Sequence, residues 1–127
     1  MDAILRNFVR GRAGDRCEYC RTHQDQDPFF RFHCEHIIAR QHGGPTAEAN
    51  LAWACHHCNL HKGPNLSGID PTSGTHVPLF NPRQHTWSEH FTANGPLVVG
   101  LTPIGRATIR VLDINAASRM QMRAATR

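Results

Sequence analysis

Residues 50–63 read NLAWACHHCNLHKG and combine a strand signal, a pair of cysteines and a helix signal in one short stretch. The apolar segment 51–54 predicts a short strand. The residues that follow can form a helix, and a glycine and a proline after Lys62 predict a stop or a kink. Cys55 and Cys58 lie at the beginning of this helix, separated by two residues. The stretch therefore indicates a strand that leads through a possible metal knuckle into a helix.

A second Cys-x-x-Cys pair lies at residues 17–20. Two residues between cysteines allow both thiolates to face one ion, and two such pairs complete a tetrahedron around zinc. Two disulfides are the alternative, but they are typical of secreted proteins, and a redox Cys-x-x-Cys would be a single pair in a βαβ setting. His56 or His57 could also replace one cysteine ligand. We expect a structural zinc ion in a closed four-thiolate site, held by Cys17, Cys20, Cys55 and Cys58.

Residues 29–39 read FFRFHCEHIIA and predict a longer strand, because Phe30, Phe32 and Cys34 alternate with polar side chains. We expect Cys34 to lie in the core, since a buried free cysteine behaves as a small hydrophobic residue. The Gly-Gly-Pro sequence at 43–45 predicts a long turn. The two predicted strands should therefore form a β-hairpin.

The adjacent Glu35 and His36 on the predicted strand have the chemistry of a hydrolytic site. A carboxylate is a ligand suited to Mg²⁺ or Mn²⁺, and an imidazole that titrates near neutral pH can remove a proton from water. Adjacent side chains on a strand diverge, so an acid and a base at consecutive positions can address different sides of one phosphate. A solvated carboxylate beside a packed histidine is the ordinary structural alternative for such a pair.

The flanking segments predict further helices and a second hairpin. Residues 3–13 have apolar side chains at helical spacing. Thr102 followed by Pro103 is typical of a helix beginning. Residues 65–84 are rich in Pro, Gly, Ser and Thr, which indicates a loop of low regularity. The other expected elements are a hairpin of residues 86–91 and 96–101, a helix that begins at 103 and a final helix over 116–125.

The basic side chains are concentrated at the two ends of the chain. Residues 1–16 carry four arginines and two aspartates, residues 17–95 five basic and seven acidic side chains, and residues 96–127 five arginines and one aspartate. Basic ends favour a polyanionic partner such as DNA, although an ordinary solvated surface has the same composition. The expected DNA-binding residues are Lys62, Arg106, Arg110, Arg119 and Arg123, with Arg127 continuing the last arginine series.

The sequence contains no apolar run of the length that crosses a bilayer, so no membrane partner is expected. The N-terminus has an aspartate at position 2 and arginines after its apolar residues, which is the wrong order for a secretory signal. We therefore expect a cytoplasmic protein.

Three segments, CEYC (17–20), EHIIARQHGG (35–44) and NLAWACHHCNLHKG (50–63), resemble HNH endonucleases of the zinc-knuckle type in their order and spacing. The resemblance covers residues 9–63. It implies an α+β fold with a small ββα-metal hairpin-helix core, an embedded pair of zinc knuckles, an N-terminal helix and a C-terminal hairpin plus helices. We expect one domain, residues 1–127, in which residues 64–127 form a C-terminal extension without an assigned role.

The resemblance implies a metal-dependent DNA endonuclease with His36 as the general base. Glu35 would hold Mg²⁺ or Mn²⁺, at a position where the family more often has aspartate, and Asn59 would be the second protein ligand to that ion. Asn50 would bond the backbone of the connecting loop and so orient His36, although an asparagine there is also an ordinary turn residue. Cleavage would leave a 5′-phosphate and a 3′-hydroxyl. The alternative is a zinc-containing DNA-binding module that does not cut.

Overall fold

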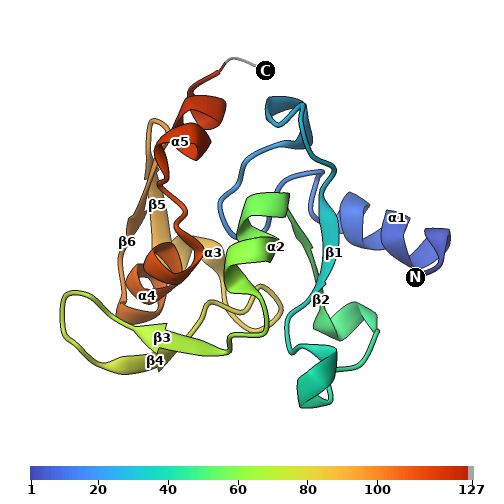
Figure 1. Cartoon of the computed structure of the whole chain (residues 1–127), viewed down its shortest axis with the longest axis horizontal. Coiled ribbons are helices and arrows are strands. Elements are labelled where there is room, and N and C mark those ends of the chain that lie inside the picture. Colours follow the sequence, from blue (N-terminus) through green and yellow to red (C-terminus); the bar gives the residue numbers. More distant parts are fainter. Residues whose placement is uncertain (126–127) are drawn as a thin grey trace.

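An antiparallel hairpin of β1 (His33–His36) and β2 (Leu51–Ala54) lies beside the short helix α2 (His56–Lys62) (Figure 1). The computed structural model describes residues 1–125. Figure 1 shows α2 in the centre, with the hairpin on one side and the C-terminal helix α4 on the other. The chain thus has an α+β fold with a ββα core, as the sequence predicts.

The first strand is shorter than predicted, and Glu35 is buried as well as Phe32. Only residues 33–36 pair with β2, and Glu35 lies opposite Ala52. Glu35 is buried, Cys34 is half-buried against the core and Phe30 is 53% exposed. The expected burial of Phe30 is wrong, because the chain becomes extended β-structure only after Phe32 and no strand holds Phe30 against the core.

The loop between β1 and β2 turns back tightly at Gly44. A Cβ atom at this position would lie 1.8 Å from the carbonyl oxygen of Ile38 and 2.9 Å from Nδ2 of Asn50. Only glycine allows this close approach of two backbone segments. Two 3₁₀ turns, Arg40–His42 and Glu48–Asn50, complete the loop.

The predicted N-terminal helix is confirmed as α1 (Ala3–Arg12), whose first turn is capped by the carboxylate of Asp2. The guanidinium of Arg12 donates hydrogen bonds to the carbonyl oxygens of Glu48 and Leu51, at 3.0 and 2.7 Å. Arg6 lies over the ring of Trp53. Arginines of α1 therefore hold this helix against β2 instead of forming a free basic surface.

The C-terminal part contains more regular structure than predicted. The expected loop 65–84 includes a short antiparallel hairpin, and residues 87–90 of the expected second hairpin are helical instead. The two predicted final helices are confirmed, and Thr102 caps the first of them. The elements are β3 (Ser67–Ile69), β4 (His76–Pro78), α3 (Trp87–His90), β5 (Phe91–Asn94), β6 (Leu97–Gly100), α4 (Pro103–Leu112) and α5 (Ala117–Ala124).

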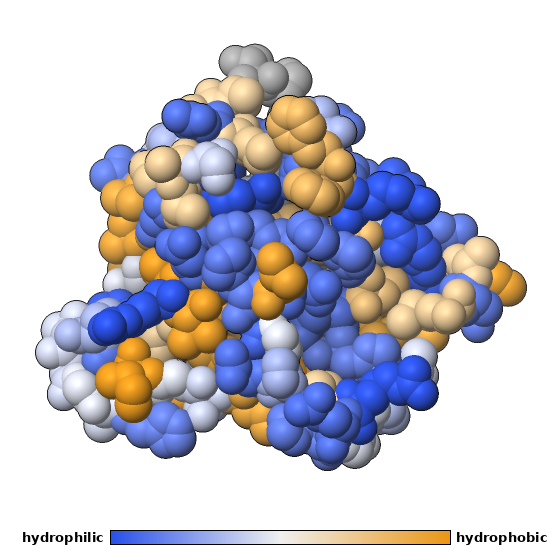
Figure 2. Space-filling view, in the orientation of Figure 1, coloured by the Kyte–Doolittle hydropathy of each residue, from blue (hydrophilic) through white to orange (hydrophobic). Residues whose placement is uncertain are grey.

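One cluster of buried side chains joins both halves of the chain. It runs from Val9 and Trp53 in the N-terminal half to Phe80, Phe91 and Leu112 in the C-terminal half. The face shown in Figure 2 is mainly hydrophilic, with scattered hydrophobic side chains between the polar ones. Among the described residues, no helix has the length and apolar character needed to cross a membrane.

Candidate metal centre and active site

The four cysteines of the two Cys-x-x-Cys pairs converge in the interior. Their Sγ atoms all lie within 4.8 Å of one another, and Cys20 and Cys55 are 3.8 Å apart. Zinc–sulfur bonds of about 2.3 Å in a tetrahedron place the sulfur atoms roughly 3.8 Å apart. A disulfide would bring two sulfur atoms to about 2.0 Å, whereas all the cysteines are free. The donor set and its spacing fit one zinc ion, held by Cys17, Cys20, Cys55 and Cys58.

The four thiols of this cluster titrate unequally. Burial raises the pKa of Cys17, and hydrogen bonds with the other cluster thiols raise the pKa of Cys58. Hydrogen bonds with the Cys17 and Cys55 thiols hold the pKa of Cys20 well below its usual range. The hydroxyl of Thr22 lies 3.1 Å from Sγ of Cys20, and the amide of Cys58 donates to Sγ of Cys55 at the beginning of α2. Zinc binds the deprotonated thiol, so these contacts prepare the site for a metal.

A second group of polar side chains lines a shallow depression between β1 and α2. Glu35 and His36 border it from the strand, Asn59 from the helix and Arg40 from the connecting loop. The volume of the depression is about 440 Å³. The carboxamide of Asn59 and the guanidinium of Arg40 make no hydrogen bond to any residue that the structure describes. Both side chains are therefore free to bind a ligand there.

His36 is half-buried at the end of β1, where one ring nitrogen is already bonded. Its Nε2 lies 2.8 Å from Oγ1 of Thr46, in the loop between the strands. Burial, with a contribution from the charge of Arg40, lowers the pKa of His36 below its ordinary value. This shift favours the neutral form of the imidazole, which can accept a proton.

Glu35 forms a buried ion pair with Lys62. Nζ of Lys62 lies 2.6 Å from Oε2 of Glu35 and also donates to the carbonyl oxygen of Ile37. The hydroxyl of Tyr19 donates to Oε1. Burial raises the pKa of Glu35, although Lys62 and Tyr19 both oppose this rise. The carboxylate borders the depression, but two protein groups already use it.

Asn50 ties the two ends of the connecting loop together. Its Oδ1 accepts from the amide of Ile38, and its Nδ2 donates to the carbonyl oxygens of Ile38 and Pro45, at 2.9 to 3.0 Å. The loop that begins just after His36 is thus closed by one side chain. That Asn50 also sets the orientation of His36 stays a prediction.

A family model described as HNH endonuclease matches residues 17–65, the segment that contains both cysteine pairs, the hairpin and α2. The segment that matches this model, residues 17–65, is called the HNH domain below. No curated protein and no solved structure matches the chain. The HNH domain supports a nuclease-type function and metal binding.

Lys62 and Arg119 are not exposed for the expected DNA contacts. Lys62 of the HNH domain is only 2% exposed and is paired with Glu35. Arg119 on α5 is buried, and its Nη1 lies 2.9 Å from Oδ2 of Asp27. A buried charge that is already paired cannot reach a DNA phosphate without leaving its partner unpaired, which is costly.

Two of the other predicted arginines also have partners inside the protein. Arg106 makes two hydrogen bonds of 2.9 Å to the buried carboxylate of Asp70, and these hold the pKa of Asp70 well below its usual range. Arg123 donates to backbone oxygens of Pro96 and Ile114. Arg110 is exposed on α4, and Arg127 lies outside the described residues. The arginine series thus mainly holds the C-terminal extension together.

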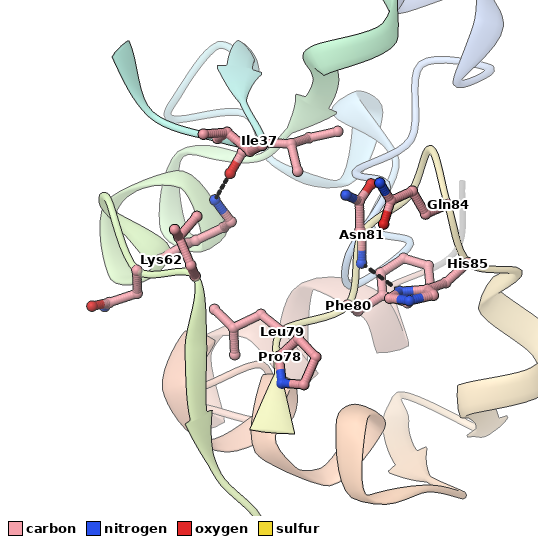
Figure 3. A pocket seen from close by; sticks show the side chains of 11 residues that line it. Ile37, Lys62, Pro78, Leu79, Phe80, Asn81, Gln84 and His85 are labelled. Atoms are coloured by element: carbon pink, nitrogen blue, oxygen red, sulfur yellow. Dashed lines mark hydrogen bonds between the residues drawn. The ribbon is translucent and has the colours of Figure 1, made fainter. Parts of the chain in front are cut away.

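A cavity of about 140 Å³ separates the HNH domain from the C-terminal extension (Figure 3). Ile37 and Lys62 line it on one side, and Pro78, Leu79 and Phe80 on the other. Figure 3 shows the bond from Lys62 to the carbonyl of Ile37 at its edge. The cavity is too small for a nucleotide. The depression around His36 is the candidate active site because Glu35, His36 and Asn59 line it together.

Sequence reasoning missed three side chains of this site. Thr46 and Arg40 lie in a turn that has no periodicity, and Tyr19 lies between the first two cysteines. The only signal in the sequence is the nearness of these residues to the motif segments. Their contacts with His36 and Glu35 depend on how the hairpin closes over α2.

Proposed function

We propose that this protein is a metal-dependent DNA endonuclease whose active site is the depression between β1 and α2. His36, Glu35 and Asn59 line this one depression within the HNH domain, and this observation carries the proposal. Zinc in the four-cysteine cluster is structural, because four thiolates leave no open position for a substrate.

His36 is the proposed general base. In the proposed tautomer Nε2 donates to Oγ1 of Thr46, and the lone pair of Nδ1 is then free to take a proton from water. The hydroxide equivalent attacks phosphorus in line with the leaving oxygen. The 3′ oxygen leaves, so the products carry a 5′-phosphate and a 3′-hydroxyl.

Glu35 and Asn59 are the proposed ligands of Mg²⁺ or Mn²⁺. Asn59 offers a carboxamide oxygen without a protein partner in the described chain, and oxygen donors suit these ions. The carboxylate of Glu35 has about four lone-pair sites, of which Tyr19 and Lys62 use two. A bound divalent ion would neutralise the charge that develops on the phosphate and the leaving oxygen.

Arg40 is the proposed phosphate-binding side chain. It is exposed, it borders the depression with His36, and its guanidinium has no hydrogen-bond partner among residues 1–125. Guanidinium groups bind phosphate oxygens in a bidentate manner. Arg40 therefore takes the role in DNA binding that the sequence assigns to Lys62.

Cleavage of supercoiled plasmid tests the proposed function. We expect the purified protein to convert plasmid to the nicked or linear form with Mg²⁺ or Mn²⁺, and EDTA to stop the reaction. DNA ligase should reseal the nicks without pretreatment, because the ends are 5′-phosphate and 3′-hydroxyl. Binding of DNA without cleavage under any divalent ion would refute the enzyme and support a DNA-binding module.

Replacement of Thr46 by valine should lower kcat roughly 10- to 100-fold with little change in KM, because the imidazole of His36 loses its orienting partner. Valine has the shape of threonine but no hydroxyl. Thr46→Ser keeps the hydroxyl and should retain most of the activity. Nitrogen chemical shifts of His36 should show a changed tautomer in Thr46→Val alone. Equal kcat values for the two variants would contradict the role of Thr46.

A further inference from the structure

Helix α2 carries two histidines on the side away from the candidate active site. His57 and His61 are four residues apart, so they lie on one face of the helix. Asn59, two positions from each, lies about 160° around the helix axis from both. Their ring centroids are 4.0 Å apart, at an angle of 32°. His57 is half-buried and His61 is exposed. This histidine pair belongs neither to the cysteine cluster nor to the depression around His36.

Each ring has one nitrogen bonded to a carbonyl oxygen. Nε2 of His57 lies 2.8 Å from the carbonyl oxygen of Asp113, and Nδ1 of His61 lies 2.8 Å from that of His57. A carbonyl oxygen only accepts, so these nitrogens carry the protons. The opposite nitrogens, Nδ1 of His57 and Nε2 of His61, hold lone pairs. Histidines that bind metals have this arrangement, with the second nitrogen bonded to a carbonyl.

Asp113 brings a carboxylate to the same place from the end of α4. Its backbone has φ 47° and ψ 48°, a left-handed conformation, and its amide bonds to carbonyl oxygens of the last turn of the helix. The backbone at this position is thus well defined. Its carboxylate is exposed and has no ion pair or hydrogen bond to other described residues.

We propose that His57, His61 and Asp113 form a second metal site, distinct from the four-cysteine cluster, that takes a zinc-type divalent ion. One nitrogen of each histidine and a carboxylate oxygen of Asp113 lie within 4.8 Å of one another. Tetrahedral zinc with bonds of about 2 Å needs donor atoms roughly 3.3 to 3.5 Å apart. Rotation of the exposed His61 and Asp113 side chains can close this difference.

The chemistry of the three donor side chains indicates which ion the site binds. Two imidazoles with one carboxylate suit Zn²⁺ and its transition-metal neighbours, whereas Mg²⁺ and Ca²⁺ prefer oxygen ligands alone. Water would complete the coordination, because the protein supplies three donors. The ion would link α2 of the HNH domain to the end of α4, two helices that already pack together. The site gives the C-terminal extension a structural role and does not depend on the proposed function.

Titration of the full-length protein with Zn²⁺ tests this proposal. Before the titration, elemental analysis must show that the sample contains only the tightly bound zinc of the cysteine cluster. We expect calorimetry to show one further zinc ion per chain. His61→Ala should weaken this second binding at least roughly 100-fold, and Asp113→Asn, which tolerates the left-handed backbone, at least roughly 10-fold. His76→Ala, an exposed histidine on β4, is the matched control and should bind like the wild type.

Two results would overturn the proposal. One is the absence of a second zinc ion at tenfold excess of Zn²⁺. The other is a second zinc ion that persists in His61→Ala and is lost in His36→Ala, which would place it in the candidate active site. In the supporting outcome, imidazole nitrogen signals of His57 and His61 shift on addition of zinc, while the first zinc ion stays bound in all variants.

Discussion

His36→Ala is expected to lower the rate of plasmid cleavage about 10²- to 10⁴-fold, the usual contribution of a general base. The variant removes the one imidazole that lines the depression with Glu35 and Asn59. The fold should not change, because His36 is only half-buried and its side chain has one hydrogen bond in the described part of the chain, to the exposed Thr46. Zinc content and the unfolding temperature should therefore equal those of the wild type. Cleavage kinetics, elemental analysis and thermal melting measure the three quantities.

His42→Ala is the matched control for this experiment. His42 is an exposed histidine of the same loop, and within residues 1–125 its ring bonds only to the carbonyl oxygen of Pro64. The His42→Ala variant should cleave plasmid at the rate of the wild type. Equal cleavage by the His36 and His42 variants would show that His36 is not the base.

Loss of one zinc ligand is expected to unfold the protein. Cys58→Ser replaces a fully buried thiol of the four-cysteine cluster, at the beginning of α2. Structural zinc contributes about 10–16 kcal/mol in small zinc-binding domains, and small proteins are stable by only about 5–15 kcal/mol. We therefore expect Cys58→Ser to bind less than one zinc ion and to lose its cooperative thermal transition. Circular dichroism and elemental analysis provide the measurement.

Cys34→Ser is the control for the cysteine variant. Cys34 lies on β1, half-buried and outside the cluster. It should keep its zinc and melt cooperatively. A Cys58 variant that melts like the Cys34 variant, with full zinc content, would refute a structural metal at this position.

Local patterns were sufficient to predict most elements of the fold. The strand β2 and the helices α1, α2, α4 and α5 follow from spacing, caps and breakers within a few residues of each element. The four-cysteine cluster follows from two Cys-x-x-Cys pairs and is matched by the structure. The hairpin of β3 and β4 was missed, because its strands are three residues long and rich in glycine and proline.

Local sequence patterns did not reveal the ion pairs whose partner lies far away in the chain. Lys62 pairs with Glu35 across 27 positions, Arg106 with Asp70 across 36 and Arg119 with Asp27 across 92. A sequence read locally shows a free basic side chain in each case. In these pairings Lys62 and Arg119 are buried, whereas Arg40 is exposed at the candidate site.

The sequence by itself determined the ββα core, the four-cysteine cluster and the placement of an acid and a histidine on the first strand, because these depend on residue spacing within short segments. Only the tertiary structure decided which side chains are free to act. Glu35 is buried and bonds to Lys62 and Tyr19, and Thr46 lies beside His36 because the connecting loop folds back. Packing of α4 beside α2 brought Asp113 to the two histidines. Such contacts depend on the positions of distant segments, which no local pattern specifies.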